Sequence, residues 1–388
     1  ALRSGKKIQW DAAALSAVYA YFILYAAYVQ TEAFFICAFF WSLERALTLL
    51  QVLRSAPAGV VPASSADGPS TGATQPSTLA KLRFAHLQPS TSLAAGHSSI
   101  GLTPGQLSTF NLQLTTSLAV SLGLATLLRQ SILPWIAVMY LYILWETWKI
   151  REKNQRKSGP TFGWHVISVI SVPLIVVLFV APFTIRNYIA YGDFLLLNSN
   201  AGYAMYSAQH PMHGTSFQEY AAAPLPDDID HASMNEATWD KELMRRGIGF
   251  VLADPGRYLL LSLSRVRDFV EFWPTADTSP LFNLGRVLSI GILLPFMLYG
   301  VFLAVRPHRQ DSQHLQPATC NSSRIFNLQS SIFNLSFMVF YSLLHIFTWA
   351  MPRYRLPVDA VALPFAALAL WTLAAHIRSR RLRPSSGS

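Results

Sequence analysis

The chain has 388 residues, of which 52% are hydrophobic and 13% charged, and its mean hydropathy is +0.31. A soluble domain carries about twice that charged fraction. The apolar residues are blocked into long runs, so the composition excludes an ordinary soluble protein and predicts an all-α polytopic membrane protein. The formal net charge of +10 would suit nucleic acid in a soluble protein. Here the positive charge lies mostly in loops on one side, so we expect no nucleic-acid partner.

Eight apolar runs are predicted to span the membrane, each near the length that crosses about 30 Å of hydrocarbon. They are expected at residues 11–30, 33–52, 111–128, 131–149, 164–185, 283–305, 331–350 and 357–376. The expected organisation is two spans in 1–54, a disordered cytoplasmic loop at 55–110, three spans in 111–185, an extracytoplasmic segment at 186–280, one span in 281–306, a cytoplasmic loop at 307–330, two spans in 331–377 and a basic cytoplasmic tail at 378–388.

Charge predicts the orientation of these spans. The loops assigned to one side hold 18 of the 30 Lys and Arg residues, whereas the large segment 186–280 on the other side holds 12 acidic and 7 basic residues. The positive-inside rule therefore places the first set of loops in the cytoplasm and predicts a multi-pass protein of the cell (inner) membrane.

Two of the cytoplasmic loops have the composition of insertions. Residues 55–110 are rich in Ala, Ser, Thr, Pro and Gly and nearly uncharged, which predicts disorder because they cannot bury enough apolar surface to offset chain entropy. Residues 307–330 are expected to be poorly ordered and dispensable in the same way.

The extracytoplasmic segment is predicted to hold two helices. The first runs from Asn235 to Ala253, with Trp239, Leu243, Ile248 and Leu252 as its apolar positions. Asp254 and Pro255 have the residue types of an N-cap and a first helical residue. The apolar stretch 256–273 that follows is interrupted by arginines, so a helix lying in the membrane interface fits it better than a span.

Two arginines in one turn suggest a phosphate site. Arg353 and Arg355 flank Tyr354 between two apolar runs, in a turn that the topology places on the outer face. A guanidinium group forks onto phosphate oxygens and keeps its charge at any ordinary pH. An extended segment before Pro357 would put both arginines on one side and Tyr354 on the other. The alternative is that both arginines reach toward lipid headgroups beside an aromatic-belt tyrosine.

Further polar residues fall on the same face. Glu32 opens the second span and is a candidate for catalysis or sugar binding, or it complements the positive end of its own helix. Arg129 interrupts an apolar hairpin and Arg186-Asn187 ends the fifth span, so these residues are candidate substrate or phosphate ligands. Arg186 and Asn187 fit equally a helix C-terminus stabilised by cationic charge.

A metal site is disfavoured by the spacing of the candidate ligands. The histidines and aspartates of the outer segment follow no tight helical or knuckle pattern, so loop composition explains them more simply. They are His210, His213, His231, Asp227, Asp228 and Asp230. No residue is assigned as a metal ligand and no cofactor is identified, and whether a divalent metal takes part stays open.

Four short segments carry a resemblance to a family. They are Tyr28-Val29-Gln30-Thr31-Glu32, Gly123-Leu124-Ala125-Thr126-Leu127-Leu128-Arg129, Ala181-Pro182-Phe183-Thr184-Ile185-Arg186-Asn187 and Arg353-Tyr354-Arg355-Leu356-Pro357. Their order and shared outer-face placement make the chain similar to membrane glycosyltransferases of the GT-C type. It resembles most the bacterial relatives of protein O-mannosyltransferases and of lipid A aminoarabinose transferases.

The resemblance implies an enzyme that moves a sugar from a polyprenyl-phosphate donor to a lipid, glycan or protein acceptor at the outer leaflet. Arg353, Arg355 and Arg186 would bind the donor phosphate, and Asn187, Tyr354 and Arg129 would contact substrate. No residue matches the family's catalytic aspartate, so we expect that base upstream of this chain and the chain alone to be inactive. Membrane lipids are expected partners. A transporter or lipid flippase is the alternative, although transporters gather polar groups near the bilayer midplane.

Overall fold

The computed structural model describes residues 2–27, 31–55, 104–155, 163–218, 221, 223–229, 233–306 and 320–381, and the described residues form helices and turns but no strand. The all-α prediction is therefore confirmed. The longer helices are α1 (Leu2–Val18), α2 (Ala20–Ala27), α3 (Thr31–Ser55), α4 (Pro104–Leu128), α5 (Leu133–Gln155), α6 (Gly163–Tyr191), α8 (Glu236–Ala253), α9 (Pro255–Val270), α11 (Ile292–Val305), α12 (Cys320–Phe347) and α13 (Leu356–Arg381). Shorter elements are η1 (Gln130–Ile132), α7 (Ala201–Gln209), η2 (Pro211–His213), α10 (Pro280–Arg286), the π-helical turn η4 (Val287–Gly291) and η5 (Pro352–Arg355).

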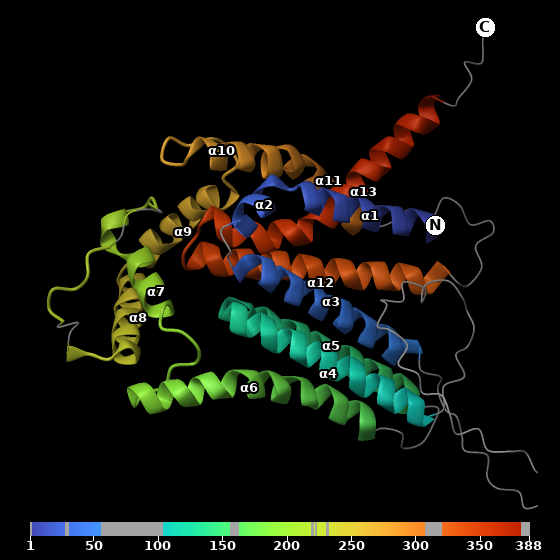
Figure 1. Cartoon of the computed structure of the whole chain (residues 1–388), viewed down its shortest axis with the longest axis horizontal. Coiled ribbons are helices and arrows are strands. Elements are labelled where there is room, and N and C mark those ends of the chain that lie inside the picture. The colour runs from blue at the N-terminus through green and yellow to red at the C-terminus, as the bar shows by residue number, and fades with distance from the viewer. Residues whose placement is uncertain are drawn as a thin grey trace, which may run out of the picture.

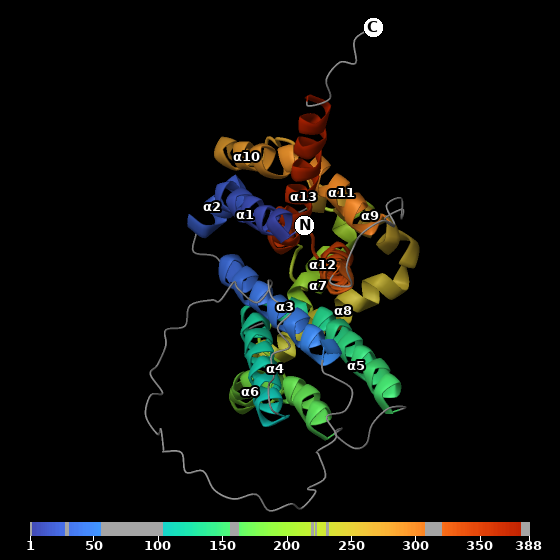
Figure 2. The ribbon, with the colours of Figure 1, turned by 90° about the vertical axis from the view of Figure 1, so that its right-hand side faces the viewer.

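The long helices form a bundle with a small helical cap at one end. In Figure 1 α3, α4, α5, α6 and α12 run across the view, and α7, α8 and α9 gather at the left end. Figure 2, seen along the bundle, separates a group containing α3 to α6 from a group containing α1, α2, α10, α11 and α13, with α12 between them. We call the end where α3 begins and α12 ends the site end of the bundle.

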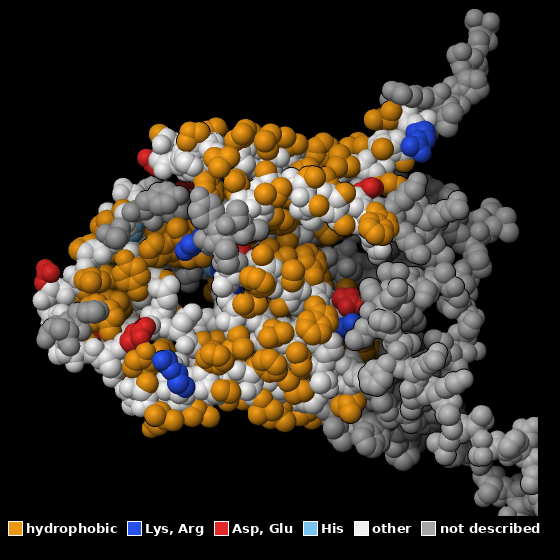
Figure 3. Space-filling view, in the orientation of Figure 1, with side chains coloured by type: hydrophobic (Ala, Val, Ile, Leu, Met, Phe, Trp, Pro, Cys, Tyr) orange, Lys and Arg blue, Asp and Glu red, His pale blue; other side chains and the backbone are white. Residues whose placement is uncertain are grey.

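Five helical segments are long and apolar enough to cross a membrane. They are Thr31–Val52, Ile170–Tyr191, Pro280–Val305, Ser330–Phe347 and Pro352–Arg378. Hydrophobic side chains spread over the middle of the bundle in Figure 3, with charged groups toward its two ends. An apolar outer surface of this kind indicates an all-α membrane protein because a soluble bundle would bury it.

The other three expected spans are present only as shorter or less apolar helices. The run at 11–30 is broken between α1 and α2 at Tyr19, and the run at 111–128 corresponds to the apolar part of α4, Leu112–Leu128. The run at 131–149 lies in α5, whose Glu146 and Lys149 add charge to an aromatic-rich sequence. Five candidate spans therefore stand among the described residues where eight were expected.

Both predicted loops contain residues that are helical. Helix α4 begins at Pro104 and α12 begins at Cys320, so residues 104–110 and 320–330 are not loop as expected. Once a span has formed, each further residue adds a backbone hydrogen bond without the cost of a new nucleus, so helices extend past their apolar part. The rest of the two expected loops, 56–103 and 307–319, lies outside the described residues.

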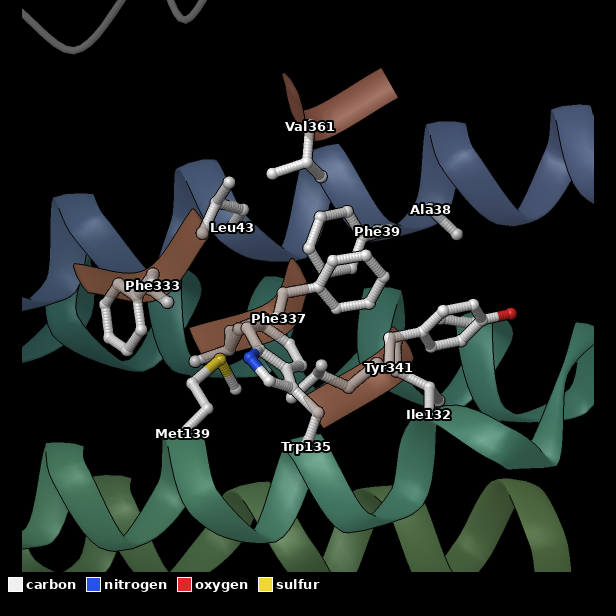
Figure 4. Packing of buried hydrophobic residues seen from close by; sticks show 14 of the residues in the cluster. Ala38, Phe39, Leu43, Ile132, Trp135, Met139, Phe333, Phe337, Tyr341 and Val361 are labelled. Carbon is white, nitrogen blue, oxygen red and sulfur yellow. The ribbon is translucent and has the colours of Figure 1, made fainter. Parts of the chain in front are cut away.

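The core of the bundle is aromatic where three helices meet. The ring of Phe39 on α3 lies 4.0 Å from Phe337 on α12 and 5.1 Å from Trp135 on α5, as centroid distances (Figure 4). The Trp135 and Phe337 rings meet edge to face at 5.5 Å. Such pairs stabilise packing beyond the area that they bury, so α12 is held between α3 and α5.

The cap at the site end contains both helices predicted from the sequence. Helix α8 begins after Asn235, whose side chain accepts from Thr238 N at 2.9 Å, and α9 begins after Asp254, whose side chain accepts from Arg257 N at 2.9 Å. The N-cap predicted at Asp254 is confirmed. Of the apolar positions named for α8, Leu243 is buried, whereas Ile248 and Leu252 are exposed.

The contact between α11 and α13 depends on Gly300. A Cβ atom built there would lie 1.8 Å from the backbone oxygen of Phe365. We expect Gly300→Ala to force the two helices apart and to lower the thermal midpoint by several degrees, because overpacking against backbone typically costs about 1–3 kcal/mol. The measurement is thermal unfolding of the purified protein in detergent.

The matched control for this prediction is Gly249→Ala in α8. No heavy atom lies within 4 Å of its Cβ position, so the added methyl group should be neutral or stabilising by up to about 1 kcal/mol. Equal midpoints for the two variants would contradict the close approach of α11 and α13.

Candidate functional site

A buried ion pair joins the start of α3 to the end of α4. Arg129 Nη2 donates to Glu32 Oε1, and the two side chains are only 13% and 4% exposed. Arg129 follows the last residue of α4 in an extended conformation, which turns its side chain toward the first turn of α3. Two charges this well enclosed are tolerated because each neutralises the other. The sequence-predicted residues Glu32 and Arg129 are thus brought together.

Two guanidinium groups lie beside the Tyr354 ring. The Arg129 guanidinium carbon is 5.3 Å from the ring centroid and that of Arg353 is 5.1 Å from it. Arg353 Nη2 also donates to the Tyr354 hydroxyl at 3.3 Å. A cation near an aromatic ring is attracted by the electrons of the ring, so Tyr354 holds two like charges in one place.

Two residues of α12 complete this cluster. The His345 ring stacks on the Tyr354 ring with centroids 4.6 Å apart and planes 19° apart, and the Tyr341 ring meets His345 at 4.8 Å. His345 Nε2 and Arg129 Nε are buried without a hydrogen-bond partner among the described residues. We call Glu32, Arg129, Tyr341, His345, Arg353 and Tyr354 the arginine cluster.

Sequence reasoning missed Tyr341 and His345. Both lie inside an apolar run, and the signal available was their spacing of four residues, which places them on one face of α12. Only the packing of α12 against η5 and α3 shows that this face meets Tyr354.

Arg355 lies in a different network. Its Nε is 3.1 Å from Asp359 Oδ1, and its Nη1 donates to the carbonyl oxygens of Phe269 at 2.7 Å and Glu271 at 3.2 Å. The Tyr19 hydroxyl donates to Asp359 Oδ2 at 2.8 Å. Arg355, Asp359 and Tyr19 are all at most 3% exposed, so Arg355 and Asp359 together join η5, α9 and α13 to Tyr19, between α1 and α2, in the interior.

The turn that carries both arginines is helical, which corrects the prediction of an extended segment. Residues Pro352–Arg355 form the 3-10 helix η5, and Leu356 has φ −49° and ψ −42° where an extended conformation was expected. Residues two apart in a 3-10 helix are separated by about 240°, so Arg353 and Arg355 point in different directions. Leu356 is helical because α13 starts there, and Pro357 follows within its first turn, where no backbone N–H is needed.

Arg186 and Asn187 organise the chain after α6. Asn187 Nδ2 donates to the carbonyl oxygens of Leu195 at 3.2 Å and Leu197 at 2.9 Å, and its Oδ1 accepts from Arg186 Nη1 at 3.1 Å. Hydrogen bonds from Ser199 and Tyr191 lower the pKa of Glu236, and the positive charge of Arg186 adds to this effect. These contacts place Arg186 beside Glu236 at the edge of the cap, and they give Asn187 a role in fixing the loop.

Arg265 fastens the cap to α12. It is fully buried, and it donates to the Ala208 carbonyl, to Gln209 Oε1 at 3.1 Å and to the Ile346 carbonyl at 3.3 Å. Its partners lie at the C-terminal ends of α7 and α12, where free carbonyl groups carry partial negative charge. Burial lowers the pKa of Arg265 to about 10. The Arg265 guanidinium thus donates to free carbonyl oxygens at the ends of two helices, next to His345.

The histidines considered as metal ligands make local contacts. His213 Nε2 lies 3.0 Å from the Ser207 carbonyl, and His210 Nδ1 accepts from Met212 N at 3.2 Å. Burial lowers the pKa of both His210 and His213. Among the described residues no three His, Cys, Asp or Glu side chains gather as a metal site would require, and Asp230 and His231 lie outside those residues.

The fold and this cluster define an all-α membrane protein with two cationic side chains, Arg129 and Arg353, beside one tyrosine ring at one end of its bundle. Comparisons with protein-family models, with curated proteins and with solved structures gave no significant match. The resemblance to GT-C glycosyltransferases therefore rests on the four sequence segments alone.

We expect the Glu32–Arg129 pair to be strongly coupled. Glu32→Gln should lower the thermal midpoint because it leaves a buried cation without its partner, and breaking such a pair costs up to about 3–5 kcal/mol. Combining it with Arg129→Gln should cost less than the sum of the single changes. The measurement is a double-mutant cycle of thermal unfolding. Glu44→Gln, at a side chain that is 61% exposed, is the control, and an equal loss there would contradict the coupling.

Asp268 predicts a pH dependence of stability. Burial, with a smaller contribution from Glu271, raises the pKa of Asp268 to about 6. The folded state therefore binds this proton more tightly than the unfolded chain, and the stability it adds is lost as pH rises from about 4 through 6. Asp268→Asn should raise the thermal midpoint above that of the wild type at pH 8 and leave it unchanged near pH 4. Asp277→Asn at an exposed site is the control, and a pH-independent difference would contradict the assignment.

Proposed function

We propose that this protein binds a polyprenyl-phosphate sugar donor through its arginine cluster and transfers the sugar to a lipid, glycan or protein acceptor. The observation that carries the proposal is the position of two guanidinium groups, from Arg129 and Arg353, 5.3 Å and 5.1 Å from the centroid of one tyrosine ring. The phosphate leaving group gains negative charge in the reaction, and cations that are already in place stabilise that charge. The Tyr354 ring holds the two guanidinium groups in position.

The hydrogen-bond donors of the cluster support the phosphate assignment. The Arg129 Nε and His345 Nε2 atoms are buried without a partner among the described residues, although unsatisfied buried donors are costly. A phosphate offers several acceptor oxygens and matches the fork of a guanidinium group. The phosphodiester of an incoming donor, and the polyprenyl phosphate monoester released when the sugar leaves, would therefore be suitable partners for the Arg129 Nε and His345 Nε2 atoms.

The contacts in the structure change which arginines we assign to the donor phosphate. Arg129 takes the place beside Arg353 that Arg355 was expected to occupy. Arg355 and Arg186 act as supports, because Arg355 donates to a backbone carbonyl inside the bundle and Arg186 donates to Asn187 beside Glu236 of the cap. Glu32 is a positioning residue that orients Arg129.

Charge asymmetry supports an outward orientation of the site. The described residues of the acidic segment 186–280 lie at the site end, and the positive-inside rule assigns the basic loops to the cytoplasmic side. This orientation supports the proposal, because a lipid-linked donor presents its phosphate at the outer boundary between hydrocarbon and water.

Binding of farnesyl phosphate, a short polyprenyl phosphate, by the chain in nanodiscs tests the proposal. We expect Arg353→Gln to weaken binding about tenfold or more relative to wild type, because a charge-assisted hydrogen bond contributes about 1.5–3 kcal/mol. Arg353→Lys should fall between them, since it keeps the charge but loses the fork. Affinity is measured by the quenching of intrinsic tryptophan fluorescence.

Two controls make the result specific. Arg245→Gln, at a side chain that is 71% exposed on the cap, should bind farnesyl phosphate as the wild type does. Farnesol, which lacks the phosphate, should bind wild type and Arg353→Gln equally. A farnesyl phosphate affinity that does not change in Arg353→Gln would reject the phosphate site.

A further inference from the structure

Helix α9 presents its most apolar side to the exterior of the protein. Leu259, Leu260 and Leu263 are 61%, 54% and 68% exposed, and Val266 is 37% exposed. These four residues recur at helical spacing and form one face, which we call the outward face of α9. Next to its start, Leu252 at the end of α8 is 74% exposed.

The side of α9 that faces the protein carries polar groups. Arg265 and Ser262 are buried at 0% and 3% exposure. Ser264 Oγ accepts from Phe217 N at 2.9 Å, and Asp268 keeps a carboxylate oxygen buried. Leu261 and Phe269 share this inner side, so it is mixed, whereas the outward face is apolar from Leu259 to Val266 and ends at the exposed Arg267.

This polarity is the reverse of what water requires. A surface helix in water turns its apolar stripe to the core and its charged residues outward. Contiguous apolar surface left outside marks a contact with a membrane or another protein. The environment outside the outward face of α9 must therefore be at least as apolar as the protein interior that contacts the other side of the helix.

Three observations favour lipid as the occupant. Helix α9 packs against α12 and η5, at the ends of two candidate spans, and the span Pro280–Val305 begins ten residues after α9 ends. The Arg267 guanidinium carbon lies 5.8 Å from the ring of Trp273, and Arg with Trp is the residue pair that anchors helices at the level of lipid headgroups. The face thus continues from surfaces that already meet the bilayer.

We propose that the outward face of α9 lies in the leaflet at the site end, with Leu259, Leu263 and Val266 among the upper acyl chains and Arg267 at the phosphates. The sequence predicts an interfacial helix, and the structure specifies which side of it meets lipid. The inference does not depend on the proposed transfer reaction, because it requires no donor. It fixes the depth of the arginine cluster, which is joined to α9 through Arg355 and Arg265.

Lipid-depth quenching tests this surface in the full chain. A single cysteine replaces Leu263 in a Cys37→Ser, Cys320→Ser background, is labelled with NBD and is reconstituted in phosphatidylcholine–phosphatidylglycerol vesicles. We expect blue-shifted NBD emission that a lipid with a doxyl group at carbon 5 quenches at least twofold. The same label at Lys241→Cys, whose parent side chain is 52% exposed on α8, should emit as in water and stay unquenched.

Each other outcome overturns the proposal. Water-like emission at residue 263 would show that the face is solvated. Blue-shifted emission without doxyl quenching would show that protein covers it, either a second copy or another partner. Should the 263 variant fail to fold, the label at Val266→Cys gives the same reading at a less exposed position of the same face.

Discussion

Buried guanidinium groups join the helices at the site end of this bundle. Arg129 links α4 to α3, Arg265 links α9 to the ends of α7 and α12, and Arg355 links η5 to α9 and α13. Arg286 adds an ion pair with Glu271 at 2.7 Å, which ties α10 to the segment after α9. A guanidinium group suits this task because its five donors lie in one plane and can reach several acceptors at once. Helix ends, where carbonyl oxygens have no partner within the helix, supply those acceptors.

The arginines at this end of the bundle have two different roles. Arg265 and Arg355 donate to backbone carbonyls and hold the cap and η5 in place. Arg129 is fixed by Glu32, yet one of its nitrogen atoms is buried without a partner among the described residues. Arg353 lies on the same tyrosine ring as Arg129. Because Arg265 and Arg355 hold the surrounding helices rigidly, the like charges of Arg129 and Arg353 can be kept close together, as the proposed anion site requires.

The cap and the arginine cluster both adjoin the last turn of α12. Arg265 fastens the cap to the last turn of α12 by donating to the Ile346 carbonyl. Ile346 follows His345 of the arginine cluster in the sequence. A cap held this way cannot rise from the bundle without breaking buried hydrogen bonds. An apolar outward face on α9 would then keep the arginine cluster at the level where phosphate groups lie.

The sequence by itself determined the helical, apolar character of the protein and several of its helix ends. Periodicity and residue types predicted α8 and α9, with Asp254 as the N-cap of α9, because caps act within one helical turn. Glu32, Arg129, Arg353 and Tyr354 were also recognised as candidates from residue type and topology. Helix positions and N-caps depend on interactions between residues close in the sequence, so the sequence alone predicts them.

Only the tertiary structure decided which of these residues meet. The separation of Arg353 from Arg355 followed from the start of α13, which draws the turn before it into a 3-10 helix. The inclusion of His345 and the interior role of Arg355 depend on contacts between residues far apart in the sequence, such as Arg355 with Phe269. The exposure of Leu263 and the burial of Arg265 reverse the usual preference of their residue types. Such outcomes depend on what surrounds each helix, and neither hydropathy nor spacing along one chain contains that information.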